Sequence, residues 1–156
     1  MPLATYKTIL LLCFQQVTMH RSFRIIAFIL LLFNAISALF GGWVLMSDPS
    51  GETLDMPIRF LEHSPFETFL VPGIILFITN GLFSLLFAVM ALLKFMKYSR
   101  LVIFQGFILV GWLTIQIIMI REFNGALNLL YFSVGFLLIA SGWILARQDQ
   151  VIYQSH

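Results

Sequence analysis

The chain is poor in the residues from which enzyme and metal sites are built. It has a single cysteine, Cys13, so it cannot form an intrachain disulfide, a Cys-x-x-Cys redox pair or a thiolate metal cage. Its three histidines, His20, His63 and His156, lie far apart in the sequence and cannot be assumed to converge. Catalysis needs a nucleophile with a base, a metal triad or paired carboxylates, and only His63 with a neighbouring glutamate offers an acid–base pair. The sequence therefore predicts a protein that is not an enzyme and has neither metal nor cofactor.

Charged residues are scarce as well. Only 10% of the 156 residues are charged and 60% are hydrophobic, with a mean hydropathy of +0.98, which is outside the range of soluble globular domains. The net charge of +2 does not indicate nucleic-acid binding, because the basic residues lie beside the apolar runs, where orientation in a membrane explains them. The composition predicts a membrane protein whose first partner is the lipid bilayer.

Four apolar runs have the length needed to cross a bilayer, about 20 residues for a hydrocarbon core of about 30 Å. They cover residues of about 23–46, 69–95, 101–120 and 126–146. Together they use most of the chain and leave a single membrane domain. The predicted fold class is all-α, an integral membrane four-helix bundle with a structured outer loop at 47–68 between the first two helices.

The basic residues near these runs fall mostly on one side of the predicted bundle. If both termini and the link between the second and third runs share a side, that side carries seven basic residues and the other carries two. The positive-inside rule then places both termini in the cytoplasm (N-in/C-in). The seven are Lys7, Arg21, Arg24, Lys94, Lys97, Arg100 and Arg147, and the two are Arg59 and Arg121.

The first 20 residues contain an apolar stretch, Ile9 to Phe14, that is too short to span a bilayer and lacks the cleavage site of a signal peptide. An alternative is that translation begins at Met19, since residues 19–24 suit a cytoplasmic segment that leads into the first span. Neither start changes the four predicted spans.

The outer loop does not resemble a flexible linker. Residues 48–51, Asp-Pro-Ser-Gly, are typical of a turn, because proline presets one dihedral and glycine adopts a positive one. After Pro57, the mixture of apolar and polar residues at 58–63 suits one or two helical turns in the headgroup layer. Asp48, Glu52 and Asp55 have oxygen ligands for a cation, but their spacing fits no calcium loop, so a solvated acidic rim is the preferred interpretation.

The second span has its own predicted start and bend. Ser64 as N-cap, Pro65 at the first helical position and Glu67 three residues after the cap match a capping box, so the helix is predicted to begin there. Pro72 and Gly73 then fall inside the helix, where proline removes a backbone hydrogen bond, and a kink that is structural or opens a crevice is predicted.

Several short motifs stand out in this half of the chain: Gly41-Gly42-Trp43, Asp48-Pro49-Ser50-Gly51, Met56-Pro57, Ser64-Pro65-Phe66 and Pro72-Gly73. Together they resemble a widespread group of small four-helix bacterial inner-membrane proteins for which no activity is established. The resemblance covers the first two spans with their loop, and more weakly the last two. It implies the location and the fold, and that the loop is the working surface, but it supplies no catalytic residue.

Polar residues occur at mid-membrane depth. Asn34 lies near the middle of the first span, and Asn80, next to Thr79, lies near the middle of the second. Adjacent antiparallel helices could pair the two amides, which would otherwise be costly in hydrocarbon. These residues are interpreted either as a polar site along a solute path or, preferably, as interhelical contacts. Trp112, near the centre of the third span, is either a packing residue or part of a lipid or quinone groove.

Two function classes remain. One is a non-enzymatic accessory or scaffold component that binds a membrane-protein partner, or a second copy of the chain, through its outer loop. The other is a small-molecule or lipid transport or binding protein that uses the mid-membrane polar residues and the kink. The first is preferred, because the loop is the most elaborated segment and no ionisable side chain lies deep in a span. The candidate interaction surface comprises Asp48, Pro49, Ser50, Gly51, Arg59, His63 and Glu67.

Overall fold

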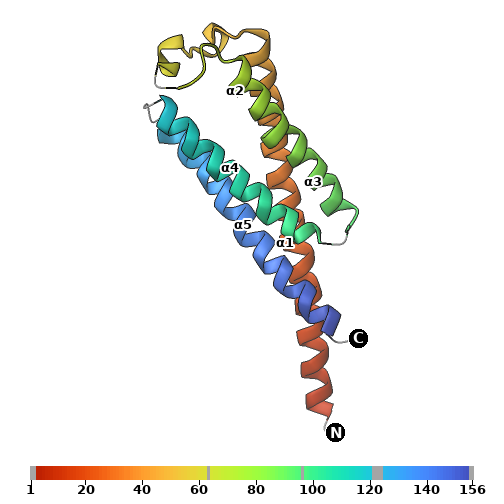
Figure 1. The fold of residues 1–156 in the computed structure, drawn as a ribbon. Coiled ribbons are helices and arrows are strands. Elements are labelled where there is room, and N and C mark those ends of the chain that lie inside the picture. Colours follow the sequence, from red (N-terminus) through yellow and green to blue (C-terminus); the bar gives the residue numbers. More distant parts are fainter. Residues whose placement is uncertain (1–2, 63, 96, 121–124, 155–156) are drawn as a thin grey trace.

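The computed structural model describes residues 3–62, 64–95, 97–120 and 125–154. This part of the chain is helical and contains no strand (Figure 1). The elements are α1 (Leu3–Ser47), two 3-10 helices η1 (Glu52–Leu54) and η2 (Ile58–Leu61), α2 (Leu70–Ile75), the π-helical segment η3 (Leu76–Leu82), α3 (Phe83–Leu92), α4 (Tyr98–Ile120) and α5 (Gly125–Gln154).

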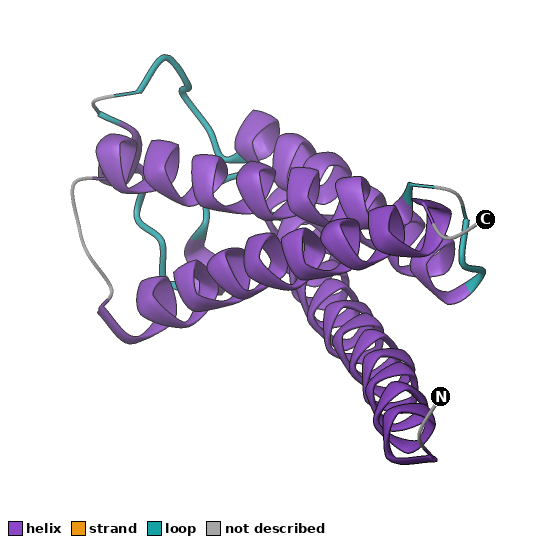
Figure 2. Cartoon of the chain, turned by 90° about the horizontal axis from the view of Figure 1, so that it is seen from below, coloured by secondary structure: helices purple, strands orange, loops and turns teal. Residues whose placement is uncertain are grey.

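Two helical hairpins make up the bundle. The continuous rod α2–η3–α3 runs antiparallel to α1, and α5 runs antiparallel to α4 (Figures 1 and 2). The start of α1 and the end of α5 lie at one end of the bundle, here called the terminal end. The segment between α1 and α2 lies at the opposite end, here called the loop end.

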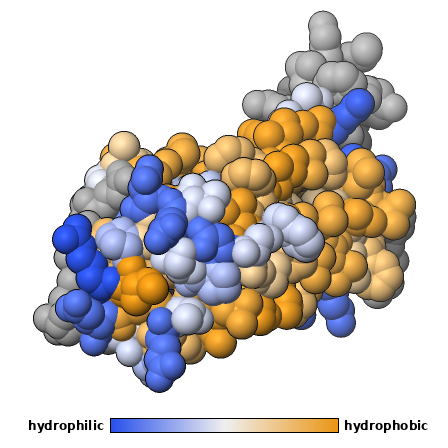
Figure 3. Space-filling model, turned by 90° about the horizontal axis from the view of Figure 1, so that it is seen from above, coloured by the Kyte–Doolittle hydropathy of each residue, from blue (hydrophilic) through white to orange (hydrophobic). Residues whose placement is uncertain are grey.

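Within the described residues, four helices are long and apolar enough to cross a membrane: Thr18–Ser47, Leu70–Leu92, Tyr98–Met119 and Gly125–Asp149, with mean hydropathies between 2.0 and 2.3. They coincide with the four predicted apolar runs, so the predicted all-α four-helix architecture is confirmed. Large apolar side chains are exposed on the flanks, whereas hydrophilic residues gather at the loop end (Figure 3). This distribution matches helices whose outer surfaces contact an apolar solvent.

The core lies mainly toward the terminal end. On α1 the buried residues Ala27, Leu31, Ala35 and Ala38 recur at intervals of three or four and define one helix face. This part of the bundle packs α1 against α3 and α5. Ala27 and Leu31 share one core cluster with the small residues Ala88 and Ala91 of α3 and with buried residues of α4 and α5. Small buried residues of this kind are typical of helices that associate in lipid, where close packing, and not transfer out of water, drives association.

Glycines permit the closest helix contacts. A Cβ atom placed on Gly42 would lie 2.9 Å from the carbonyl oxygen of Gly73, so α1 and the first turn of α2 approach through backbone. Gly106 and Gly135 play the same role between α4 and α5, where an added Cβ on Gly106 would lie 2.8 Å from the Gly135 oxygen. Each hairpin is therefore closed tightly within itself.

The predicted helix start at Ser64 is wrong. Residues 64–69 are not helical, with bends at 64–65 and 67–69, and α2 begins at Leu70 with Phe69 as its N-cap. The Ser64 hydroxyl accepts a hydrogen bond from the Phe66 amide, at 3.2 Å, and no capping bond to residue 67 is present. The physical reason is an anchor to the preceding turn, since the Phe69 amide donates to the Pro49 carbonyl at 2.9 Å and the Phe69 side chain is buried.

This later start also removes the basis for the predicted kink at Pro72 and Gly73. Pro72 lies in the first turn of α2, where amide groups have no partner within the helix, so its missing N–H costs nothing. The irregularity lies further along, in the π-helical turn at Leu76–Leu82. Such turns are rare and occur often at functional sites.

Candidate functional site

A cavity of about 920 Å³ lies between the two hairpins at the loop end. Its wall consists of residues from α1 between Asn34 and Leu45, from the loop between Leu54 and Phe69, and from the start of α2. The opposite wall comes from α4, between Leu109 and Met119, and from α5, between Leu127 and Tyr131. We call this cavity the groove.

The groove is about half as long as a membrane span. The twelve residues from Asn34 to Leu45 rise about 16 Å along α1, and those from Leu109 to Met119 rise about 15 Å along α4. One leaflet of a bilayer with a hydrocarbon core of about 30 Å has the same depth. The volume is at the upper end of the range for small-molecule sites, about 300–1,000 Å³. The dimensions suit a long apolar molecule that lies along the helices.

The side chains along the groove are mostly apolar, with few polar groups. Two aromatic residues, Trp112 and Tyr131, line the groove. From the sequence, Trp112 was predicted to be either a packing residue or part of a groove. Tyr131 also stacks on Phe33 of α1, with ring centroids 5.9 Å apart. The amides Gln116 and Asn128 line the wall near the loop end. An apolar wall with a few polar groups is typical of sites for hydrophobic ligands.

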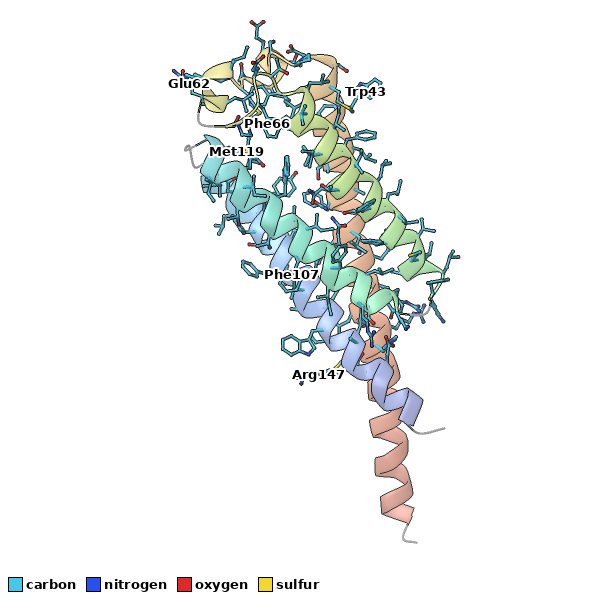
Figure 4. All side chains as sticks on the ribbon, viewed as in Figure 1. Trp43, Glu62, Phe66, Phe107, Met119 and Arg147 are labelled. Atoms are coloured by element: carbon cyan, nitrogen blue, oxygen red, sulfur yellow. The ribbon has the colours of Figure 1, made fainter. Side chains whose placement is uncertain are left out.

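The loop covers the groove with an apolar underside. Leu61 and Phe69 are buried against Leu45 of α1, and Phe66 packs against the same cluster. Met119, from the loop end of α4, packs there too, and Figure 4 shows Phe66 and Met119 near each other where the hairpins meet the loop. The predicted helical turn after Pro57 is confirmed as η2, which carries Leu61. We call the described residues of this segment, 48–62 and 64–69, the lid.

Asp48 organises the first half of the lid. Its carboxylate accepts hydrogen bonds from the amide and hydroxyl groups of Ser50 and from those of Thr53, the latter at 2.8 and 2.7 Å. These bonds, those of Ser50 first, lower the pKa of the Asp48 carboxyl from 3.8 to about 2. The predicted turn is confirmed, because the Gly51 amide donates to the Asp48 carbonyl at 3.1 Å and Gly51 adopts a φ of 79°.

A cluster of polar residues lies behind the inner end of the groove, and Asn34 is its member that lines the groove; we call this cluster the floor. Asn34 is 1% exposed. Its side-chain amide donates to the hydroxyl oxygen of Ser84, at 2.7 Å, and to the backbone carbonyl of Asn80, at 3.3 Å. The structure thus brings Asn34 and Asn80 together, but through the backbone of Asn80 rather than through a pair of side-chain amides. This bonding satisfies the Asn34 donors at a depth where unsatisfied groups are costly.

A third amide completes the floor. The Gln105 side chain donates to the Thr79 carbonyl, at 3.2 Å, and to the side-chain oxygen of Asn80, at 3.4 Å. Asn80 in turn donates to the Thr79 hydroxyl at 3.2 Å. Thr79 and Asn80 belong to the π-helical turn, whose carbonyls accept these bonds from α1 and α4. The candidate polar site is therefore a contact among three helices that ends the groove at mid-depth.

The predicted outer-loop surface divides into two parts. Asp48, Pro49, Ser50 and Gly51 form the internal turn of the lid, so most of their polar groups are already bonded. Arg59 and Glu67 are exposed, and the Arg59 guanidinium lies over the ring of Phe60. His63 lies outside the described residues. Within the described residues no group of three acidic, histidine or cysteine side chains could hold a metal ion.

A second polar cluster at the terminal end was missed by sequence reasoning. His20 of α1 and Asp149 of α5 are 129 positions apart, yet the His20 ring nitrogen and an Asp149 carboxylate oxygen are separated by 3.1 Å. The Ser99 hydroxyl of α4 donates to the other Asp149 oxygen at 3.0 Å, and the Tyr98 hydroxyl lies 3.5 Å from His20. The sequence contained one sign of this cluster: Asp149 is the one acidic residue on the basic side of the predicted topology.

Comparison with known proteins found no matching family model, no similar curated protein and no similar solved structure. The site must therefore be interpreted from its own geometry.

Proposed function

We propose that the chain is a bacterial inner-membrane protein with both termini in the cytoplasm, and that its groove binds the hydrocarbon chain of a lipid from the outer leaflet. The four apolar helices support insertion into a membrane. Seven basic residues on the terminal side against two on the other support the orientation. With this orientation the lid lies at the outer surface and the groove spans the outer leaflet.

The observation that carries the proposal is the match between groove and leaflet. The groove is about 15 Å deep, mostly apolar, covered by a lid at the headgroup level and closed by Asn34 at mid-depth. A lipid chain can enter such a site sideways from the bilayer without leaving an apolar environment. A water-soluble ligand would instead have to displace the buried apolar contacts of the lid.

Of the two function classes predicted from the sequence, this proposal is the less preferred one, the small-molecule or lipid-binding protein. The accessory role ranked first depends on a free loop surface, but much of the loop is used internally, by the Asp48 turn and by the cluster around Leu61 and Phe69. A partner-binding role is retained as the rival hypothesis, because Arg59, Glu67 and other lid residues are exposed.

The test is native mass spectrometry of the protein extracted in a mild detergent, comparing wild type with Ala38→Phe. Ala38 is 5% exposed and lines the groove, so phenylalanine there occupies space that the lipid chain needs. The matched control is Ala140→Phe, because Ala140 is exposed on α5 and does not line the groove. We expect wild type and Ala140→Phe to retain about one lipid, and Ala38→Phe to lose it.

The opposite results are equally informative. Equal lipid retention by all three proteins would overturn the proposal, because the lipid would then not occupy the groove. A stoichiometric protein that co-purifies with all three, with no retained lipid, would support the accessory role. If Ala38→Phe does not fold, Leu113→Phe tests the same wall from α4, since Leu113 also lines the groove and is 6% exposed.

A further inference from the structure

Asp55 places a negative charge at the mouth of the groove. It is the one charged side chain among the described residues that line the cavity. Its backbone is fixed, because it ends η1 with φ 52° and ψ 34° and its amide donates to the Glu52 carbonyl at 3.0 Å. The Asp55 side chain is exposed, and its carboxylate has no hydrogen bond or ion pair with any residue that the structure describes. A group that arrives at the mouth can therefore pair with it.

The rest of the lid reinforces the negative potential. Five carboxylates stand against one guanidinium in the described part of the lid, and the guanidinium, Arg59, lies over Phe60 and does not line the cavity. Such an excess raises the local concentration of cations and repels anions. The carboxylates belong to Asp48, Glu52, Asp55, Glu62 and Glu67.

Neutral amides lie across the groove from this charge. Gln116 is one turn from the loop end of α4, and Asn128 is in the first turn of α5. Amide N–H groups can donate to ester or phosphate oxygens without adding charge. The mouth thus offers an acceptor for a cation on one wall and uncharged donors on the other, which suits a zwitterionic headgroup better than an anionic one.

Resting on the proposed lipid-binding function, we infer that the groove selects amphiphiles whose headgroup carries a primary ammonium group, such as ethanolamine phospholipids, through Asp55. The hydrocarbon chain fills the apolar wall below, and the ammonium pairs with the carboxylate at the mouth. A phosphoglycerol or pyrophosphate headgroup has no cation to offer and meets the negative lid.

The experiment is a competition between headgroups with identical chains. The protein is reconstituted into vesicles of equal parts phosphatidylethanolamine and phosphatidylglycerol, re-extracted, and its retained lipid is identified by native mass spectrometry. We expect wild type to retain ethanolamine lipid about threefold over its share, as a partly exposed ion pair provides. Asp55→Asn should bring this ratio to about one, and asparagine tolerates the left-handed backbone at this position. The control Glu67→Gln removes a lid carboxylate that does not line the groove and should leave the ratio unchanged.

The outcomes separate this inference from the proposed function. Retention of both lipids in equal amounts by wild type would overturn the headgroup selection and leave lipid binding intact. An unchanged preference in Asp55→Asn, or the same loss in Glu67→Gln, would overturn the assignment to Asp55. Absence of any retained lipid in wild type would overturn both.

Discussion

Gly41 and Gly42 are neighbours on α1 with opposite surroundings, and alanine at each position separates packing from helix propensity. A Cβ on Gly42 would lie 2.8 Å from the Cβ of Phe77 and 2.9 Å from the carbonyl oxygen of Gly73. A Cβ on Gly41 would meet nothing closer than a methyl group of Leu76, at 3.7 Å. The same change therefore forces two helices apart at one position and fills free space at the next.

The magnitudes follow from two opposing effects. Alanine in a helix interior is more stable than glycine by about 0.5–1 kcal/mol, and this gain applies to both variants. Overpacking costs typically about 1–3 kcal/mol, and it applies to Gly42→Ala alone, because backbone atoms cannot rotate away as a side chain can. We expect Gly41→Ala to be neutral or slightly more stable than wild type, and Gly42→Ala to be less stable than Gly41→Ala by about 1–3 kcal/mol.

The assay is unfolding by sodium dodecyl sulfate in mixed micelles, monitored by circular dichroism, with both variants measured under identical conditions. The difference between the variants cancels the propensity gain and reports the packing cost directly. Equal stability of Gly41→Ala and Gly42→Ala would refute the reasoning, since α1 and α2 would then not approach through backbone at this point.

Three further predictions address the lid, the floor and the terminal end. Because the folded pKa of Asp48 is about 2 and its ordinary value is 3.8, its contribution to lid stability is complete above about pH 4 and is lost as the pH falls through 2. Protection of the Thr53 amide against hydrogen exchange should therefore fall between about pH 4 and pH 2. Protection that does not change with pH would contradict the role of Asp48. Asn34→Leu should cost about 1 kcal/mol in the same detergent titration, since it removes two interhelical hydrogen bonds of about 0.6 kcal/mol each, whereas a gain in stability would show that the floor is strained. Asp149→Asn should cost less than about 1 kcal/mol by weakening the contact with His20, and a larger loss would mean that this pair is shielded from solvent.

The helices were predictable because their signals, high hydropathy and sufficient length, are properties of consecutive residues. A segment of about 20 apolar residues has few alternatives to a helix, so the four predicted runs lie within a few residues of the apolar stretches of the observed helices. The helix α1 itself begins much earlier, at Leu3. The turn at 48–51 was predictable for the same local reason, since aspartate, proline, serine and glycine each favour a turn conformation. These features depend on neighbours in sequence and not on the rest of the fold.

The start of α2 was not predictable from local signals. Ser64 and Glu67 have the spacing of a capping box, but the competing contact is the bond from the Phe69 amide to the Pro49 carbonyl, twenty residues earlier. Burial of the Phe69 side chain accompanies that bond and delays the helix by one turn. The interpretation of Pro72 failed with it, because a proline costs a hydrogen bond only after the first turn.

The groove depends on which surfaces the small residues cover. Gly42 faces Gly73, and Gly106 faces Gly135, so the smallest residues are used within each hairpin and bring its two helices close. Between the hairpins the facing side chains at the loop end include Trp112 and Tyr131, and the lid cluster packs above them. Large side chains at this level prevent the backbone contact that closes each hairpin, whereas alanines and the His20–Asp149 contact bring the helices together toward the terminal end. A bundle that is closed at one end and held apart at the other leaves a space one leaflet deep, and no single span contains the pattern that produces it.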